Sequence, residues 1–251
     1  MLEPSGIAGP HKKRYLQDTL LEWYSGNSRD FPWRKGNASN YQIIISEIFL
    51  QRTRAETVAR FYPIFFSRFP DWESLCKASL QDIETTIQPL GLYKQRSTKI
   101  YQLAFELKSR GFQLPDSRNE AHDAGLSGLY ISNAFELFVL KKRAALLDVN
   151  MARILSRYFE YKNTNDLRID KQLQNLSSEI INVWNCKELN WAFLDFAALI
   201  CTARKPSCTK CPLKKQCSHH NYTITNEIEE IGTHKVNIQV ISKKKNKTSK
   251  Y

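Results

Sequence analysis

Four cysteines in one short segment carry the clearest chemical signal in the chain. The segment CTARKPSCTKCPLKKQC spaces them C-x6-C-x2-C-x5-C, among five lysines and arginines, at Cys201, Cys208, Cys211 and Cys217. Four thiolates this close in sequence could enclose a tetrahedral zinc ion or ligate an iron–sulfur cubane. Zinc modules usually pair two C-x2-C knuckles, and only one occurs here. The spacing therefore predicts a metal site and leaves both metals open.

A disulfide framework is the competing explanation for clustered cysteines. The first residues, MLEPSGIAGPHKKRYLQ, contain no apolar core of the kind a signal peptide needs, and no apolar run approaches the length of a membrane span. We therefore expect a cytoplasmic protein without a membrane partner. Disulfides are rare in such a reducing compartment, so the cysteines are expected to bind a metal rather than each other.

The charge balance indicates a polyanionic partner. The formal net charge is +12 and the isoelectric point is near 9.4. No basic amphipathic segment stands out, so nucleic acid is a better candidate than a membrane surface. The last residues, KKKNKTSKY, are expected to form a solvated tail, with nonspecific attraction to phosphate as the alternative.

Two acidic residues stand in apolar surroundings. Asp148 follows the apolar run AALL directly, and Glu47 is flanked by isoleucines and a phenylalanine within YQIIISEIFLQRT. Carboxylates are almost never fully buried unless they are paired or used. Taken alone, Asp148 is expected to cap the helix that follows it, and Glu47 to mark a helix boundary or a site. Gln51 lies four residues after Glu47, on the same helical face.

Caps and apolar spacing predict helices along most of the chain. Asn40 is expected to cap YQIIISEIFLQRT, and the capping boxes TRAE (53–56) and SLQD (79–82) are expected to open two further helices. Pro63 should kink or shorten the helix after TRAE, and Gly111 should end a helix that starts near residue 94. Later helices are expected at 130–140, 151–159, 176–184 and 190–201. Only HKVNIQVIS, in the last thirty residues, alternates weakly like a strand, so the sequence predicts an all-α fold.

Six stretches together resemble the helix-hairpin-helix (HhH-GPD) DNA glycosylases of the endonuclease III superfamily. They are the cysteine spacing, NWAFLDFAALIC, SEIFLQRT, LGLYKQR, GLSGLY and LLDVN, which span about residues 23 to 217. The resemblance implies a six-helix barrel with the hairpin over residues 31–144, and a cluster domain built from 1–30 and 145–222. A basic tail would occupy 223–251. The active site would lie in the cleft between these two lobes, and the cysteines would hold a [4Fe–4S] cluster.

The resemblance also implies roles for individual residues. Asp148 would be the catalytic acid, and Glu47 would contact a base rotated out of the duplex. The other implied residues contact DNA or position the site: Gln51 or Arg52 filling the gap in the duplex, Leu92 as a wedge from the opposite side, Gly128 in the phosphate-binding turn, Asn150 at the helix start, Arg153 near the cluster, and Arg204 and Lys205 facing the DNA backbone.

The hairpin indicates which branch of the superfamily the chain resembles. In AGLSGLY only Gly128 keeps the usual register, and Leu126 occupies a place usually given to glycine, which puts the tightness of the turn in doubt. Endonuclease III carries a nucleophilic lysine where this chain has Tyr130, and adenine glycosylases of the MutY type carry a serine. Tyr130, Glu47, Arg52 and the motif RDFPWR resemble the small mismatch glycosylases that remove thymine or uracil opposite guanine.

The resulting hypothesis is a monofunctional DNA glycosylase that acts in base excision repair on thymine or uracil mispaired with guanine. It would be a nucleoid-associated monomer that binds mismatched or damaged double-stranded DNA and leaves the abasic site to a downstream abasic-site endonuclease. Three alternatives stay open. They are an adenine glycosylase without its C-terminal reading domain, an endonuclease III-like lyase that uses Lys141 or Lys142, and a DNA-binding cluster protein without catalysis.

Overall fold

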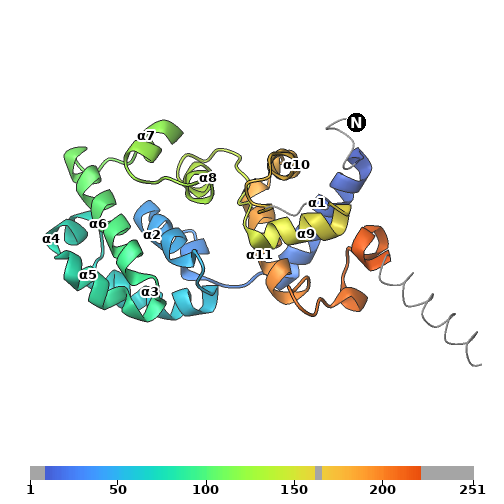
Figure 1. Ribbon diagram of the computed structural model, residues 1–251, viewed down its shortest axis with the longest axis horizontal. Coiled ribbons are helices and arrows are strands. Elements are labelled where there is room, and N and C mark those ends of the chain that lie inside the picture. The colour runs from blue at the N-terminus through green and yellow to red at the C-terminus, as the bar shows by residue number, and fades with distance from the viewer. Residues whose placement is uncertain (1–8, 162–165, 222–251) are drawn as a thin grey trace, which may run out of the picture.

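The computed structural model describes residues 9–161 and 166–221, and every regular element in these ranges is a helix (Figure 1). The α-helices are α1 (Pro10–Asn27), α2 (Asn40–Leu50), α3 (Ala55–Arg68), α4 (Trp72–Lys77), α5 (Leu80–Ile87), α6 (Tyr93–Ser109), α7 (Arg118–Asp123), α8 (Leu129–Phe138), α9 (Val149–Phe159), α10 (Lys171–Ile181) and α11 (Cys186–Leu199). Short 3-10 turns are η2 (Pro32–Arg34), η3 (Gln88–Leu90), η4 (Cys208–Lys210) and η5 (Lys214–Gln216). The all-α prediction is confirmed. HKVNIQVIS and the predicted tail lie outside the described residues.

None of the described helices combines the length and the apolar character needed to cross a membrane.

The predicted helix starts are correct in some places and wrong in others. The capping box at Ser79 is confirmed, because its side chain accepts from the Asp82 N–H and the Asp82 carboxylate accepts in return. Asn40 does not cap α2, because it is already the first helical residue. Ser39 is the N-cap, in a capping box with Gln42.

The predicted capping box at residues 53–56 is wrong. α3 begins at Ala55, and its N-cap Arg54 makes no side-chain cap bond. The Thr53 hydroxyl instead donates to the carbonyl oxygen of Leu90, 3.3 Å away on another loop. Pro63 lies inside α3 without ending it, since the helix continues to Arg68.

The helices form two lobes with separate cores (Figure 1). The first lobe contains α2 to α8, and its core includes the fully buried rings of Phe49 and Phe65. The second lobe contains α1, α9, α10 and α11. Its core includes Leu16 and Leu20 of α1 together with Phe193 of α11. The chain therefore starts in the second lobe, builds the first lobe, and returns.

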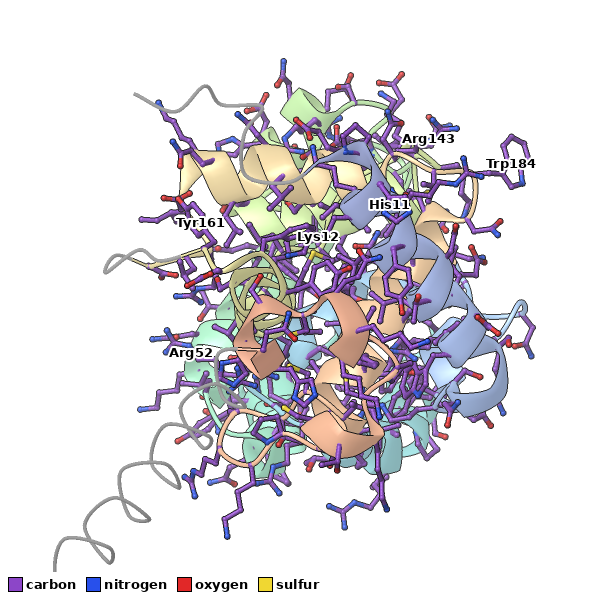
Figure 2. All side chains as sticks on the ribbon, turned by 90° about the vertical axis from the view of Figure 1, so that its right-hand side faces the viewer. His11, Lys12, Arg52, Arg143, Tyr161 and Trp184 are labelled. Atoms are coloured by element: carbon purple, nitrogen blue, oxygen red, sulfur yellow. The ribbon has the colours of Figure 1, made fainter. Side chains whose placement is uncertain are left out.

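α1 is fastened to the second lobe by contacts far apart in sequence. It packs against α11, and the half-buried Lys12 lies near the centre of the face that Figure 2 shows. The Lys12 ammonium stands over the rings of Tyr158 and Phe159 and donates to the Ser218 hydroxyl at 2.9 Å. Residues 28–39 and 139–148 are the two crossings between the lobes.

A buried ion cluster fixes the first crossing. Asp195 of α11 is fully buried and accepts from the backbone N–H and Nε of Arg29, at 2.9 and 2.7 Å. It also accepts from both terminal nitrogens of Arg34, at 2.8 and 3.1 Å. The Arg34 guanidinium lies between the rings of Phe31 and Trp191. One buried carboxylate therefore ties the segment before α2 to the second lobe.

The second crossing is tied by a small apolar cluster. Ala134, Leu137 and Phe138 of α8 pack with Leu146, and the Phe138 ring stacks on Trp191 at 5.8 Å between centroids. The Asn190 side chain accepts from the Leu146 N–H at 2.8 Å. These contacts hold residues 146–148 at the boundary between the lobes.

Candidate active site

A cleft of about 1090 Å³ opens between the two lobes. The first lobe contributes Glu47 of α2 and Tyr130 of α8 to its walls, and the second contributes Asp148 and Trp191. Arg34, from the crossing before α2, also lines it. The cleft thus collects acidic, basic and aromatic side chains from five separate elements.

Asp148 is the N-cap of α9, as its position after the apolar run predicts. One carboxylate oxygen accepts from the backbone N–H groups of Asn150 and Met151, at 2.9 and 2.8 Å. The other accepts from the Asn150 side-chain amide at 2.5 Å. Burial raises the pKa of Asp148, and these three donors oppose that rise. A carboxylate held by donors to its charged form, at the positive end of a helix, can oppose a cation formed beside it.

Asn150 and Arg153 connect Asp148 to the cysteine loop, which we define as residues 201–217. The Arg153 guanidinium donates to the Asn150 side-chain oxygen at 3.2 Å. It also donates to the carbonyl oxygens of Cys201 and Ala197, at 3.0 and 3.2 Å. The position of the first residue of this loop therefore influences the orientation of the Asn150 amide, and through that amide the orientation of Asp148.

Glu47 and Tyr130 meet across the first lobe. The Tyr130 hydroxyl donates to a Glu47 carboxylate oxygen at 3.0 Å, and Glu47 is only 5% exposed. Burial raises the pKa of Glu47 to about 7, while the Tyr130 bond and the charge of Arg34 act in the opposite direction. Burial also raises the pKa of Tyr130, so its hydroxyl keeps its proton. The pair supplies a phenolic donor and a carboxyl group that gains or loses a proton near neutral pH.

The hairpin before α8 contains two glycines in the left-handed region. Gly125 and Gly128 have φ values of 93° and 103°. Gly125 ends α7, and Leu126 is buried behind it with its N–H bonded to the Ala121 carbonyl at 2.8 Å. Leu126 itself is not in the left-handed region, so its position does not require a glycine. The turn closes and leaves Gly128 as the N-cap of α8, two residues before Tyr130.

The rim of the cleft is basic and partly apolar. Gln51 and Arg52, at the end of α2, are exposed and line it. Lys99 of α6 also lines it, and its ammonium donates to the Ser127 carbonyl at 3.1 Å. Burial lowers the pKa of Lys99. Arg52 projects on the opposite side of the molecule from Trp184 in the view of Figure 2.

The four predicted metal ligands are brought together in the cysteine loop. Each of the four is half-buried, and Cys201, Cys211 and Cys217 pack against the edge of the second core. Burial and the neighbouring cysteines raise the pKa of the Cys211 thiol to about 12, and they also raise the pKa of Cys208. The thiols therefore lie near enough to act electrostatically on one another.

Positive groups surround these thiols. Arg157 donates to the Cys201 sulfur at 3.4 Å and to the carbonyl oxygens of Thr202 and Ala203, at 2.7 and 2.9 Å. Burial raises the pKa of the Cys217 thiol, and the positive charge of Lys12 lowers it. Within residues 9–161 and 166–221, no three His, Cys, Asp or Glu side chains gather closely enough for a single metal ion. Four thiols that act on one another, beside two cations, have the donor chemistry that a thiolate-ligated [4Fe–4S] cluster requires.

The structure brings some of the predicted residues together and leaves others apart. Seven of them line the cleft: Glu47, Gln51, Arg52, Gly128, Tyr130, Asp148 and Asn150. Leu92 is 44% exposed but does not line it, and Arg204 and Lys205 are exposed on the cysteine loop. Lys141 and Lys142 do not line it either, so Lys99 is the lysine that the described cleft offers to a lyase mechanism.

Sequence reasoning missed part of the site. The residues are Arg29, Trp33, Arg34, Lys99, Trp191 and the buried partner Asp195. Two signals were available. RDFPWR places two arginines around aromatic residues, and NWAFLDFAALIC places one carboxylate in an otherwise apolar helix. A buried acid needs a cationic partner, but the sequence does not show which arginine supplies it.

Comparison with known proteins gives consistent matches. The model of the HhH-GPD superfamily base excision DNA repair proteins matches residues 45–179. The thymine/uracil-DNA glycosylase of Methanothermobacter thermautotrophicus is 33% identical over 212 residues, covering 83% of this chain and 95% of that protein. The adenine DNA glycosylase of Buchnera aphidicola subsp. Acyrthosiphon pisum is 33% identical over 208 residues, covering 82% and 59% respectively. The solved structure of a thermostable thymine-DNA glycosylase has a TM-score of 0.76 at 32% identity, covering 84% of this chain and 98% of that chain.

The raised pKa of Glu47 predicts a pH-dependent cost to stability. The folded protein keeps this proton up to about pH 7, whereas the ordinary value is 4.5. Between these values the folded state binds more protons, so stability falls as pH rises, and the full cost is present above about pH 7. Glu47→Gln keeps an acceptor for Tyr130 and removes the titration. We expect the difference in unfolding free energy between this variant and the parent to increase, in favour of the variant, by about 2–3 kcal/mol from pH 4.5 to pH 8.

Thermal and urea unfolding across this pH range measure the difference. Asp148 is present in both proteins, and its charge is one of the causes that raise the pKa of Glu47. Glu22→Gln, at an exposed position on α1, is the control and should follow the parent at every pH. Parallel stability profiles for Glu47→Gln and the parent would show that the pKa of Glu47 is not raised in the folded protein.

Proposed function

The chain belongs to the HhH-GPD superfamily of base excision DNA repair proteins and is a DNA N-glycosylase, and on that basis we propose that it removes thymine or uracil mispaired with guanine. The proposed reaction is hydrolysis of the N-glycosidic bond without cleavage of the strand. The proposed site is the cleft that contains Asp148, Glu47 and Tyr130. The product is an abasic site, left to an abasic-site endonuclease. We further propose that the protein works as a monomer on the DNA of the cytoplasmic nucleoid.

One observation carries the substrate and reaction class. Tyr130 follows the hairpin, at the place where endonuclease III has its nucleophilic lysine, and its hydroxyl is bonded to Glu47 in the cleft. A phenol has no amine nitrogen and cannot form a Schiff base with the sugar. Thymine and uracil present carbonyl oxygens, which a tyrosine hydroxyl or a protonated carboxyl group can recognise. The relatives named for thymine and uracil agree with this assignment.

The proposed mechanism begins with rotation of the mispaired base out of the stack, which costs least for a base in a mismatch. The base lodges against Tyr130 and Glu47. As the bond between the base nitrogen and C1′ breaks, its electron pair leaves with the base, and donors at the base edge stabilise that charge. Asp148 stabilises the positive sugar from the other side. A water oxygen then bonds to C1′, and its proton passes to Asp148 or to the departing base.

We propose that Cys201, Cys208, Cys211 and Cys217 hold a [4Fe–4S] cluster. When bound, the cluster would brace the cysteine loop, with no part in bond breaking. The hydrogen bonds from Arg153 and Arg157 to this loop would then hold α9 in a fixed position relative to the loop. Arg204 and Lys205 are exposed on the same loop and are the proposed contacts to DNA phosphates.

A panel of duplexes tests the proposed function. Single-turnover assays should show release of thymine and uracil opposite guanine, with slower release from matched pairs because those cost more to open. The strand should stay intact until alkali or heat is applied. Preferred release of adenine opposite 8-oxoguanine would instead support the adenine glycosylase alternative, and release of nothing from any duplex would contradict the proposal.

Asp148→Asn is the matched catalytic control for this panel. Asparagine keeps the size and most of the capping capacity but removes the negative charge. We expect base release to fall at least ~10²-fold, the scale of losing one electrostatic stabiliser, while binding to the mismatched duplex survives. Undiminished release would assign Asp148 to capping alone.

Tyr130→Lys tests the monofunctional assignment. Borohydride should trap no covalent adduct between the parent protein and DNA, because no amine is placed at C1′. The substitution supplies an amine at the place of the family nucleophile, so trapping and strand cleavage should appear. Efficient trapping by the parent would overturn the assignment, and Lys99→Arg would then identify the amine, since Lys99 lines the cleft.

Metal content tests the cluster. Protein purified without air should be brown and contain about four irons per chain. Cys208→Ala should lose iron and unfold at a lower temperature, because the group closes a loop of the second lobe. Cys76→Ala, at a half-buried cysteine outside the loop, should keep both properties of the parent. Colourless protein with one bound zinc ion would support zinc instead.

A further inference from the structure

Arg96 is a buried cation without a carboxylate partner in the described parts of the chain. It lies in the first turn of α6 and is only 5% exposed. Burial lowers its pKa, and its Nε has no hydrogen-bond partner. The first turn of α6 contains no acidic residue, and the positive end of a helix disfavours a cation. A charge opposed by both burial and the helix end needs a strong compensating interaction.

That interaction is a set of bonds to two loops. One loop follows α2 and contains Gln51, Arg52 and Thr53. The other precedes α6 and contains Gly91 and Leu92. The Arg96 guanidinium donates to the carbonyl oxygens of Leu90 and Gly91, at 3.0 and 2.7 Å, and to the Thr53 hydroxyl at 2.8 Å. It also donates to the carbonyl oxygen of Gln51.

Each of these loops contains a non-glycine residue in the left-handed region. The φ values of Arg52 and Leu92 are 60° and 51°, and both side chains are exposed. Residues in this region persist only where the surroundings determine the backbone strongly. Arg96 bonds the carbonyls of Gln51 and Gly91, which belong to the peptide groups immediately before the two left-handed residues. One planar guanidinium therefore orients both peptide groups at once.

We propose that Arg96 is a positioning residue that joins these two loops into one rigid, DNA-opening element. The inference rests on the proposed function and on the expectation, from the family resemblance, that Gln51 or Arg52 and Leu92 enter the duplex around the extruded base. Two side chains that act together on one duplex must keep a fixed separation, and two separate flexible loops would lose conformational entropy when binding orders them. A direct bond from Thr53 to the Leu90 carbonyl, at 3.3 Å, strengthens the same junction.

The test substitutes Arg96 by lysine, which keeps the charge but has one ammonium instead of a planar fork and cannot orient both peptide groups. Arg110→Lys is the matched control, at the far end of the same helix, where the arginine pairs with exposed carboxylates. Two readouts are compared. The first is single-turnover release of uracil from a G·U duplex and from the same strand without its complement. The second is the fluorescence of 2-aminopurine placed beside the uracil, and only this readout is measured in the Asp148→Asn background.

Arg96→Lys should lower uracil release from the duplex at least ~10-fold but release from the single strand no more than ~2-fold, because only the duplex must be opened. The 2-aminopurine signal of extrusion should fall in parallel, and Arg110→Lys should match the parent. Equal losses on both substrates with an intact extrusion signal, or no loss at all, would overturn the inference.

Thr53→Val provides a second variant if Arg96→Lys does not fold. It removes the hydroxyl that bonds both Arg96 and the Leu90 carbonyl, and it keeps the shape of the side chain. A selective loss on the duplex supports the inference, and unchanged extrusion contradicts it. Failure of the proposed function would look different, because the parent itself would then release no uracil from either substrate.

Discussion

The arrangement of the site depends on one fully buried carboxylate. Asp195 holds Arg29 and Arg34 with four hydrogen bonds, and these arginines belong to the segment that crosses from α1 to α2. Removing one partner of such a buried group leaves an uncompensated charge, which typically costs about 3–5 kcal/mol. The ion cluster therefore fixes how the first lobe joins the second, and it places Arg34 on the wall of the cleft beside Glu47.

The two buried acids of the cleft differ in the interactions that stabilise their charged forms. Asp148 is surrounded by donors at the start of a helix, which favour its charged form against burial. Glu47 has one hydroxyl donor and a more distant cation, and its pKa rises to about 7. Environments that separate the proton affinities of two acids allow one to remain charged while the other exchanges a proton. This difference suits a reaction that needs a negative charge at the sugar and a donor at the base.

Long-range bonds from arginine side chains to backbone carbonyls recur around the cleft. Arg153 and Arg157 hold the start of the cysteine loop, and Arg96 holds the loops at the end of α2 and before α6. A guanidinium presents several donors in a fixed plane, so it can orient irregular backbone that no helix or sheet supports. The segments that face the DNA in the proposed function are thus irregular in backbone but fixed in place by arginines from neighbouring helices.

The sequence by itself determined the fold class, most helices and the capping position of Asp148, because each depends on residues close together in the chain. It was wrong where a tertiary bond competed with a local one, as at Thr53, whose hydroxyl bonds a distant carbonyl instead of capping α3. It also did not show that Leu126 avoids the left-handed region, or that Asp195 pairs with arginines more than 160 positions away. Only the tertiary structure decided the Glu47–Tyr130 bond, the proton affinity of Glu47 and the role of Arg96. Burial and partner choice depend on which distant segments pack together, and no local pattern records that.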